Sequence, residues 1–180
     1  SVPGFDPLSI SGLKLWLDAS DIDGDNETTD NPSNGSYITT WTDKSGNGNH
    51  GVSIASPGQP IYTTGALNSN GVIEFDGIND GMSLGDVTLE SDYTIFIINR
   101  YSGAVQGRIL QSRTLGRNWL MGRWQGTLGM YAAGWVAQIP SIGTVWTLDM
   151  GTRSGATNAL YSDGALLGSQ VDGDFPGQLG

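Results

Sequence analysis

The sequence contains no cysteine and a single histidine, His50. Without cysteine, no disulfide can stabilise the fold and no thiolate can serve as a nucleophile or a metal ligand. The single histidine limits any Ser-His-Asp triad and any zinc site that needs three histidines. No apolar run approaches the roughly 20 residues needed to cross a bilayer, so we expect no direct membrane insertion.

Positive charge is also scarce. Eight Lys and Arg stand against eighteen Asp and Glu, for a formal net charge of −10. Nucleic acid is therefore not an expected partner, because phosphate binding needs a basic surface. The charges are also unevenly spread, since residues 93–148 hold five Arg and no acidic residue. The negative net charge of the whole chain suits an extracellular or saline setting, or bound divalent cations.

Glycine, by contrast, is abundant, with 28 residues often in turn-forming pairs such as Asn34-Gly35 and Asp76-Gly77. No stretch of about 12 residues repeats its apolar positions with the helical period, so little or no helix is expected. Asp163-Gly164 between two apolar runs predicts a hairpin. Short apolar stretches predict strands at residues 13–17, 72–75, 94–98, 109–111, 119–121, 128–130, 145–148 and 160–162. The chain is therefore predicted to be all-β.

Three motifs occur in order at residues 15–19 (Leu-Trp-Leu-Asp-Ala), 41–50 (Trp-Thr-Asp-Lys-Ser-Gly-Asn-Gly-Asn-His) and 75–80 (Phe-Asp-Gly-Ile-Asn-Asp). They resemble the laminin G-like, concanavalin A-like domains of bacterial secreted and surface proteins. The resemblance implies a two-sheet antiparallel jelly-roll sandwich and a secreted or cell-surface location. It also implies one domain over residues 9–180, after a linker-like segment at residues 1–8.

The strand that usually closes domains of this family is not found before the chain stops at Gly180. In a jelly roll, the loss of that strand would expose a sheet edge that can pair with another chain. We therefore expect either an incomplete domain or a strand donated by another segment or subunit.

Two acidic segments are candidate calcium sites, because calcium takes about 6 to 8 oxygen ligands. One surrounds Gly24 and the other follows the strand predicted at residues 72–75. The alternatives are a solvated acidic loop for the first and an Asx-type turn for the second. The candidate ligands are Asp21, Asp23, Asp25, Glu27, Asp30, Asp76, Asn79 and Asp80. For residues 43–50, we expect a structural loop in which Asp43 caps backbone N–H groups.

Arginines and aromatic residues alternate in the second half of the chain. Aromatic faces stack on sugars or apolar side chains, and arginine forks bind carboxylate or sulfate. Strand alternation places Trp119 and Arg123 on one face and Trp124 on the other, so one tryptophan belongs to the core. The candidate ligand-binding residues are Arg100, Tyr101, Arg113, Arg123, Trp124, Tyr131 and Trp135. In the alternative, the arginines pair with the acidic loops and the aromatic residues fill the core.

No catalytic residue is assigned. Residues 74–76 begin like the Glu-x-Asp-x-x-Glu strand of laminarinase-type enzymes of this fold, but Asn79 stands where the second glutamate belongs. We therefore expect a recognition module, not an enzyme, within a larger adhesin or secreted protein. Its ligand would be a glycan, acidic ones included, or a peptide or protein. The alternatives are a non-binding structural spacer and, more remotely, a polysaccharide hydrolase or lyase.

Overall fold

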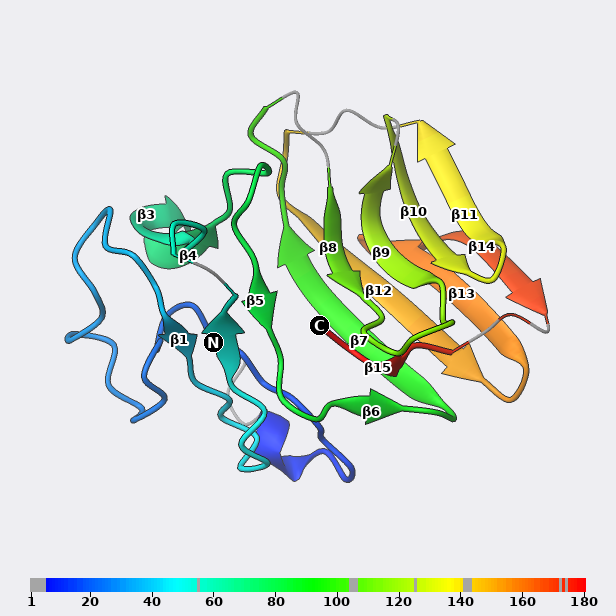
Figure 1. The fold of residues 1–180 in the computed structure, drawn as a ribbon, viewed down its shortest axis with the longest axis horizontal. Helices are drawn as coiled ribbons and strands as arrows, with labels where there is room; N and C mark the ends of the chain where they lie inside the picture. The colour runs from blue at the N-terminus through cyan, green and yellow to red at the C-terminus, as the bar shows by residue number, and fades with distance from the viewer. Residues whose placement is uncertain are drawn as a thin grey trace. The chain divides into compact units, whose positions relative to one another are not determined.

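The computed structural model describes residues 6–54, 56–103, 107–124, 126–140, 144–171, 173 and 175–180 (Figure 1). Strands and turns make up this part of the chain, and its one helical element is the 3-10 turn η1 (Pro7–Ser9). The prediction of an all-β protein with little or no helix is confirmed. The chain divides into two compact units, residues 1–87 and residues 88–180.

Unit 1 combines a small sheet with a hairpin. Its three-stranded antiparallel sheet has the order β1 (Thr40–Trp41), β2 (Gly51–Ser53) and β5 (Met82–Ser83). The hairpin joins β3 (Ile61–Leu67) to β4 (Asn70–Glu74), and its turn residues Asn68 and Ser69 have φ of 49° and 69°. The buried apolar cluster of this unit is Ile22, Ile38 and Tyr62, with Ala19, Trp41, Ile73 and Met82 packed against it.

Unit 2 contains two four-stranded antiparallel sheets. One has the order β14 (Ala165–Val171), β13 (Thr157–Ser162), β12 (Thr147–Ser154) and β7 (Tyr93–Asn99). The other has the order β11 (Trp135–Pro140), β10 (Thr127–Ala132), β9 (Trp119–Trp124) and β8 (Arg108–Gln111). Strand β11 contacts β13 and β14, so the sheets pack on each other as in a sandwich (Figure 1). The jelly-roll connectivity stays a prediction.

Alternation along the strands fills the space between these two sheets. Trp119 and Met121 of β9, Met130 of β10 and Leu160 of β13 are almost fully buried. Gly168 of β14 lets the backbones of the two sheets come close, because a Cβ there would lie 2.5 Å from the Val136 carbonyl oxygen. A side chain at that position would force β11 and β14 apart.

Most of the predicted strands are present, but residues 13–17 do not form one. Within that segment only Leu17 pairs, in an isolated bridge with Asp43. Two of its backbone groups bond to side chains, since the Trp16 N–H donates to Asp43 Oδ1 and the Lys14 carbonyl accepts from Asn49 Nδ2. The Trp16 carbonyl accepts the Lys44 N–H, outside any strand. The strand predicted at residues 145–148 corresponds to β12, which begins only at Thr147.

The predicted hairpin at Asp163-Gly164 is confirmed. It joins β13 to β14, and Asp163 and Gly164 both have positive φ, at 47° and 82°. Asp163 also fixes the neighbouring strand, because its Oδ1 accepts the Leu148 N–H at 2.9 Å. Turn chemistry readable from two residues thus sets the register of this edge of the sheet.

The last residues of the chain are paired with strands of unit 2. Strand β15 (Gly177–Gln178) pairs with β6 (Thr88–Leu89), and Gly180 exchanges two backbone hydrogen bonds with Gln111 at the end of β8. Leu179 between them is buried. A strand donated in trans stays a prediction. In the described part of the chain, no helix has the length and apolar character needed to cross a membrane.

Candidate functional site

The outer face of the sheet formed by β8 to β11 carries a groove with a volume of about 240 Å³. Strand alternation turns Leu120 and Trp124 of β9 to this face, opposite Trp119, Met121 and Arg123. Tyr131 of β10 pairs with Leu120 of β9 and with Trp135 of β11. The groove is lined by Arg108, Asn118, Leu120, Trp124, Tyr131 and Trp135.

Glycine gives the groove room for its aromatic walls. Gly122 and Gly129 pair across β9 and β10. A Cβ at Gly129 would lie 2.7 Å from the ring of Trp135, so the indole lies over this glycine. Larger residues at this point would lift the indole off the sheet.

The aromatic side chains of the groove are fixed but partly exposed. The rings of Tyr131 and Trp135 meet edge to face, with centroids 5.3 Å apart. Trp124 is 43% exposed and Trp135 is 37% exposed. Both indoles therefore offer apolar surface to solvent while their orientation is held by packing.

Arg108 brings a positive charge to the same groove. Its guanidinium carbon lies 5.6 Å from the centre of the Trp124 ring, and its Nη1 donates to Gln111 Oε1 at 2.9 Å. Within the described residues, no carboxylate lies in salt-bridge range of Arg108. The charge of this guanidinium is thus available to an anionic group beside an aromatic face.

Three of the seven predicted ligand-binding residues, Trp124, Tyr131 and Trp135, come together in this groove. The other four lie elsewhere. Arg100 stacks over Trp146, at 4.9 Å from the ring centre. The backbone N–H of Arg113 donates to the Gln178 carbonyl. Arg123 is buried within unit 2, and Tyr101 is half-buried.

Arg123 is almost fully buried and packs over the ring of Tyr101 at 4.6 Å. The Tyr101 hydroxyl accepts the Arg123 backbone N–H and donates to the Gly107 carbonyl. Burial raises the pKa of Tyr101, against the opposing effects of its hydrogen bond to the Arg123 backbone and of the Arg123 charge. Arg123 thus acts in packing, and a ligand on the outer face cannot reach its side chain.

Arg108 and Asn118 were not among the predicted residues. Arg108 pairs with Gly122 next to a bulge in β8, so its direction does not follow from simple alternation. Asn118 directly precedes β9, outside the predicted strand. The one sequence feature that pointed to Arg108 as a binding residue was its place in the run of arginines and aromatic residues.

The acidic loop of unit 1 is organised around a buried ion pair. Asp21 is almost fully buried, and Lys44 donates a short hydrogen bond to its Oδ2. Burial alone would raise the pKa of Asp21, but the bonds from Lys44 and from the N–H groups of Asn26 and Gly24 lower it overall. Lys44 also lies 3.9 Å from Asp18 and 4.8 Å from the centre of the Trp16 ring.

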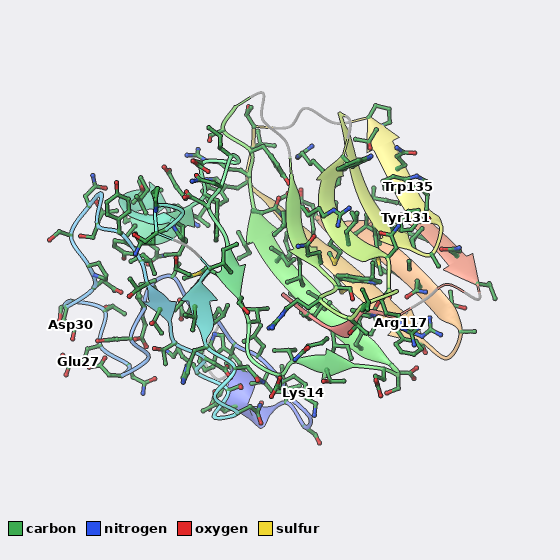
Figure 2. All side chains as sticks on the ribbon, viewed as in Figure 1. Lys14, Glu27, Asp30, Arg117, Tyr131 and Trp135 are labelled. Atoms are coloured by element: carbon green, nitrogen blue, oxygen red, sulfur yellow. The ribbon has the colours of Figure 1, made fainter. Side chains whose placement is uncertain are left out.

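Three of the predicted calcium ligands come close together. Single carboxylate oxygens of Asp21, Asp23 and Asp25 lie within 4.8 Å of one another. However, the Asp21 carboxylate already holds Lys44 and two backbone N–H groups, so this buried ligand does not fit a calcium ion while Lys44 is in place. Glu27 and Asp30 are exposed on the same loop, where they point outward (Figure 2).

This arrangement predicts a calcium response that depends on Lys44. In the wild type, excess calcium should leave the thermal unfolding midpoint close to its value in chelator, because Lys44 already neutralises Asp21. Lys44→Gln should lower stability in chelator and make the midpoint rise with calcium, since an ion bound only to the native state stabilises it. A large calcium-dependent rise in the wild type would contradict the assignment of Lys44 as the resident cation.

The second predicted calcium segment forms a turn. Asp76 Oδ1 accepts the N–H groups of Ile78, Asn79 and Asp80, and Asp80 Oδ2 accepts the N–H of Asp76. The hydrogen bonds from Ile78 and Asn79 lower the pKa of Asp76. These contacts match the Asx-type alternative, in which the carboxylates serve the backbone.

The loop at residues 43–50 is held by Asp43, as the sequence predicts. The buried Asp43 carboxylate accepts from the N–H groups of Trp16, Ser45 and Asn49 at 2.9 to 3.0 Å, and from the Ser45 hydroxyl at 2.8 Å. His50 Nδ1 accepts the Asp43 N–H at 3.1 Å. This histidine therefore has a structural partner in the loop.

Comparison of the chain with models of protein families, with curated proteins and with solved structures gives no match in any of the three.

Proposed function

We propose that this chain is an extracellular recognition module that binds an acidic glycan in the groove of β8 to β11. The observation that supports this proposal is the outward placement of Trp124 and Trp135 beside the guanidinium of Arg108. Sugar rings present C–H faces that pack on indole, and a uronate or sulfate group accepts hydrogen bonds from a guanidinium. The groove lies on an open sheet face, so a chain of sugars can extend beyond its walls.

The arginine would provide selectivity and the aromatic residues affinity. A charged group on the ligand gains from a guanidinium that has no acidic partner within the described residues. The groove lies directly over the core of unit 2, because β9 carries the buried Trp119 on one face and the exposed Trp124 on the other. The sandwich thereby gives the groove a rigid floor, which limits the entropy lost on binding.

Trp124→Ala and Trp135→Ala should each weaken binding of a uronate or sulfated oligosaccharide by about tenfold or more, because aromatic anchors dominate interfaces of this kind. Arg108→Gln should reduce the preference for acidic over neutral oligosaccharides and flatten the dependence on salt. Isothermal titration calorimetry against neutral, uronate and sulfated oligosaccharides measures both effects.

Phe96→Ala is the matched control, because this exposed aromatic residue lies on β7 of the other sheet. It should leave the affinity unchanged. If no oligosaccharide in the panel binds, or if Trp124→Ala binds as well as the wild type, the structural-spacer alternative replaces this proposal. Release of shortened or unsaturated sugars during the titration would instead favour the hydrolase or lyase alternative.

A further inference from the structure

We propose that unit 1 contains a second, separate binding site, a cavity that takes a neutral polyhydroxylated ligand the size of a monosaccharide. The cavity has a volume of about 330 Å³ and lies between the β3–β4 hairpin and the loop at residues 20–32. Its lining residues are Ser20, Thr28, Thr29, Asn31, Pro32, Tyr62, Thr64, Gly65, Ser69, Asn70 and Gly71. Cavities of this size hold small molecules in proteins.

One wall of the cavity comes from an irregular part of the hairpin. The pairing of β3 with β4 shifts register between Thr63 and Leu67, and Gly65 within this stretch has φ of 67°. The extra residues bend β3 away from a regular ladder. Asn34 Oδ1 fixes the bend by accepting the Thr64 N–H at 3.0 Å.

The opposite wall is the loop that Asn31 holds in place. Asn31 Oδ1 accepts the Ile22 N–H at 3.0 Å, and its Nδ2 donates to the Ser20 carbonyl at 2.6 Å and to the Thr28 carbonyl at 3.2 Å. Both walls are therefore braced by hydrogen bonds within the protein. A cavity between braced walls can persist without a ligand, which lowers the cost of binding.

The chemistry of the lining selects a neutral ligand. None of the lining residues is charged, and five of them carry an aliphatic hydroxyl group. Residues 1–87 nevertheless hold twelve Asp and Glu against two Lys, so an anion would be repelled by its surroundings. A divalent cation would find no carboxylate in the lining. Hydroxyl and amide groups instead match the alternating donors and acceptors of a sugar.

The side chain of Tyr62 gives further support for a ligand in this cavity. Its side chain is only 3% exposed and lines the cavity, where its hydroxyl lies against Gly71. This hydroxyl makes no hydrogen bond with any of the described residues. The hydroxyl is not among the buried side-chain atoms that lack a partner, so it is open to solvent within the cavity. A ligand hydroxyl can there replace water as its hydrogen-bond partner. Burial, and secondly the charge of Asp18, raise the pKa of Tyr62, so the hydroxyl stays protonated and can donate.

The test is a titration of ¹⁵N-labelled protein with glucose, galactose, mannose and N-acetylglucosamine at millimolar concentrations, followed by NMR. At least one of these sugars should produce saturable shift changes at the amides of Thr64, Gly65 and Gly71. Tyr62→Phe keeps the ring and removes the hydroxyl, and should weaken binding several-fold. Asn70→Trp places a large side chain at the exposed rim of the cavity and should abolish it.

Tyr161→Phe in unit 2 is the matched control and should bind as the wild type does. Trp124→Ala, which removes a wall of the groove, should also leave monosaccharide binding intact, so the two sites can fail separately. The proposal is overturned if none of the four sugars gives saturable shifts in unit 1. It is equally overturned if a folded Tyr62→Phe binds with wild-type affinity, or if galacturonate binds this cavity more tightly than galactose.

Discussion

Asp43→Ala should lower the free energy of unfolding by about 3–5 kcal/mol, because the backbone N–H groups of Trp16, Ser45 and Asn49 lose their acceptor. Each orphaned donor in a partly buried position costs roughly 1–3 kcal/mol. The effect should be large for a single polar residue, since one carboxylate joins residues 16, 43, 45 and 49. Urea-induced unfolding followed by tryptophan fluorescence measures the difference.

A second variant, Asp43→Asn, removes the charge of this side chain but keeps its size. The pH dependence of its stability loss therefore tests whether the carboxylate charge is the source of the stabilisation. Burial would raise the pKa of Asp43, but hydrogen bonds from Trp16, Ser45 and Asn49 lower it below the ordinary value of 3.8. A carboxyl group with a lowered folded-state pKa contributes stability above its unfolded pKa and loses it as pH falls through the folded pKa. The gap between wild type and Asp43→Asn should therefore be constant near neutral pH and shrink below about pH 4.

Asp30→Ala is the control for this prediction. Asp30 is an exposed acidic residue on the loop of unit 1 (Figure 2), and its replacement should change stability by about 0.5 kcal/mol or less. Comparable losses in Asp30→Ala and Asp43→Ala would show that general acidity, and not the capping of backbone donors, sets the stability of this unit.

Trp119→Ala should lower the free energy of unfolding by about 3–5 kcal/mol, the usual cost of removing a large buried aromatic side chain. Trp119 lies between the two sheets of unit 2 and is 1% exposed. Its ring meets that of Tyr93 edge to face with centroids 6.2 Å apart. Its Nε1 also donates to the Tyr93 hydroxyl at 3.0 Å, and that hydroxyl lies 3.1 Å from Asn158 Oδ1. The substitution therefore leaves a cavity and breaks a buried polar chain.

Trp124→Ala is the matched control, because it removes the same side chain from the same strand on the opposite face. It should cost at most about 1 kcal/mol of stability while it weakens oligosaccharide binding by about tenfold or more. The two variants should thus separate stability from recognition. Equal destabilisation by both would mean that the outer face of this sheet is packed as tightly as the inner one, which would argue against a ligand groove there.

Local patterns predicted much of unit 2. The apolar stretch at residues 94–98 became β7, and the Asp163-Gly164 pair became the turn between β13 and β14. Alternation along residues 119–124 correctly separated the core tryptophan from the exposed one. These features depend on neighbours within a few residues, where side-chain period and turn chemistry are decisive.

The predictions that depended on distant partners did worse. Residues 13–17 alternate like a strand, yet distant side chains such as Asp43 and Asn49 take up their backbone groups. Arg123 resembled a surface ligand residue, but the inner side of β9 buries it beside Tyr101. The acidic run at residues 21–30 resembled a calcium loop, and the sequence alone did not show that Lys44 would reach Asp21.

The sequence by itself therefore determined the all-β class, the principal hairpin and the placement of Trp119 and Trp124 on opposite faces of β9, because each of these follows from spacing within one segment. Only the tertiary structure decided which arginine reaches the groove, which cation neutralises Asp21, and that a neutral cavity lies beside Tyr62. Each of these is set by contacts between residues far apart in the chain. Such contacts depend on how loops close and sheets stack, which no short-range pattern records.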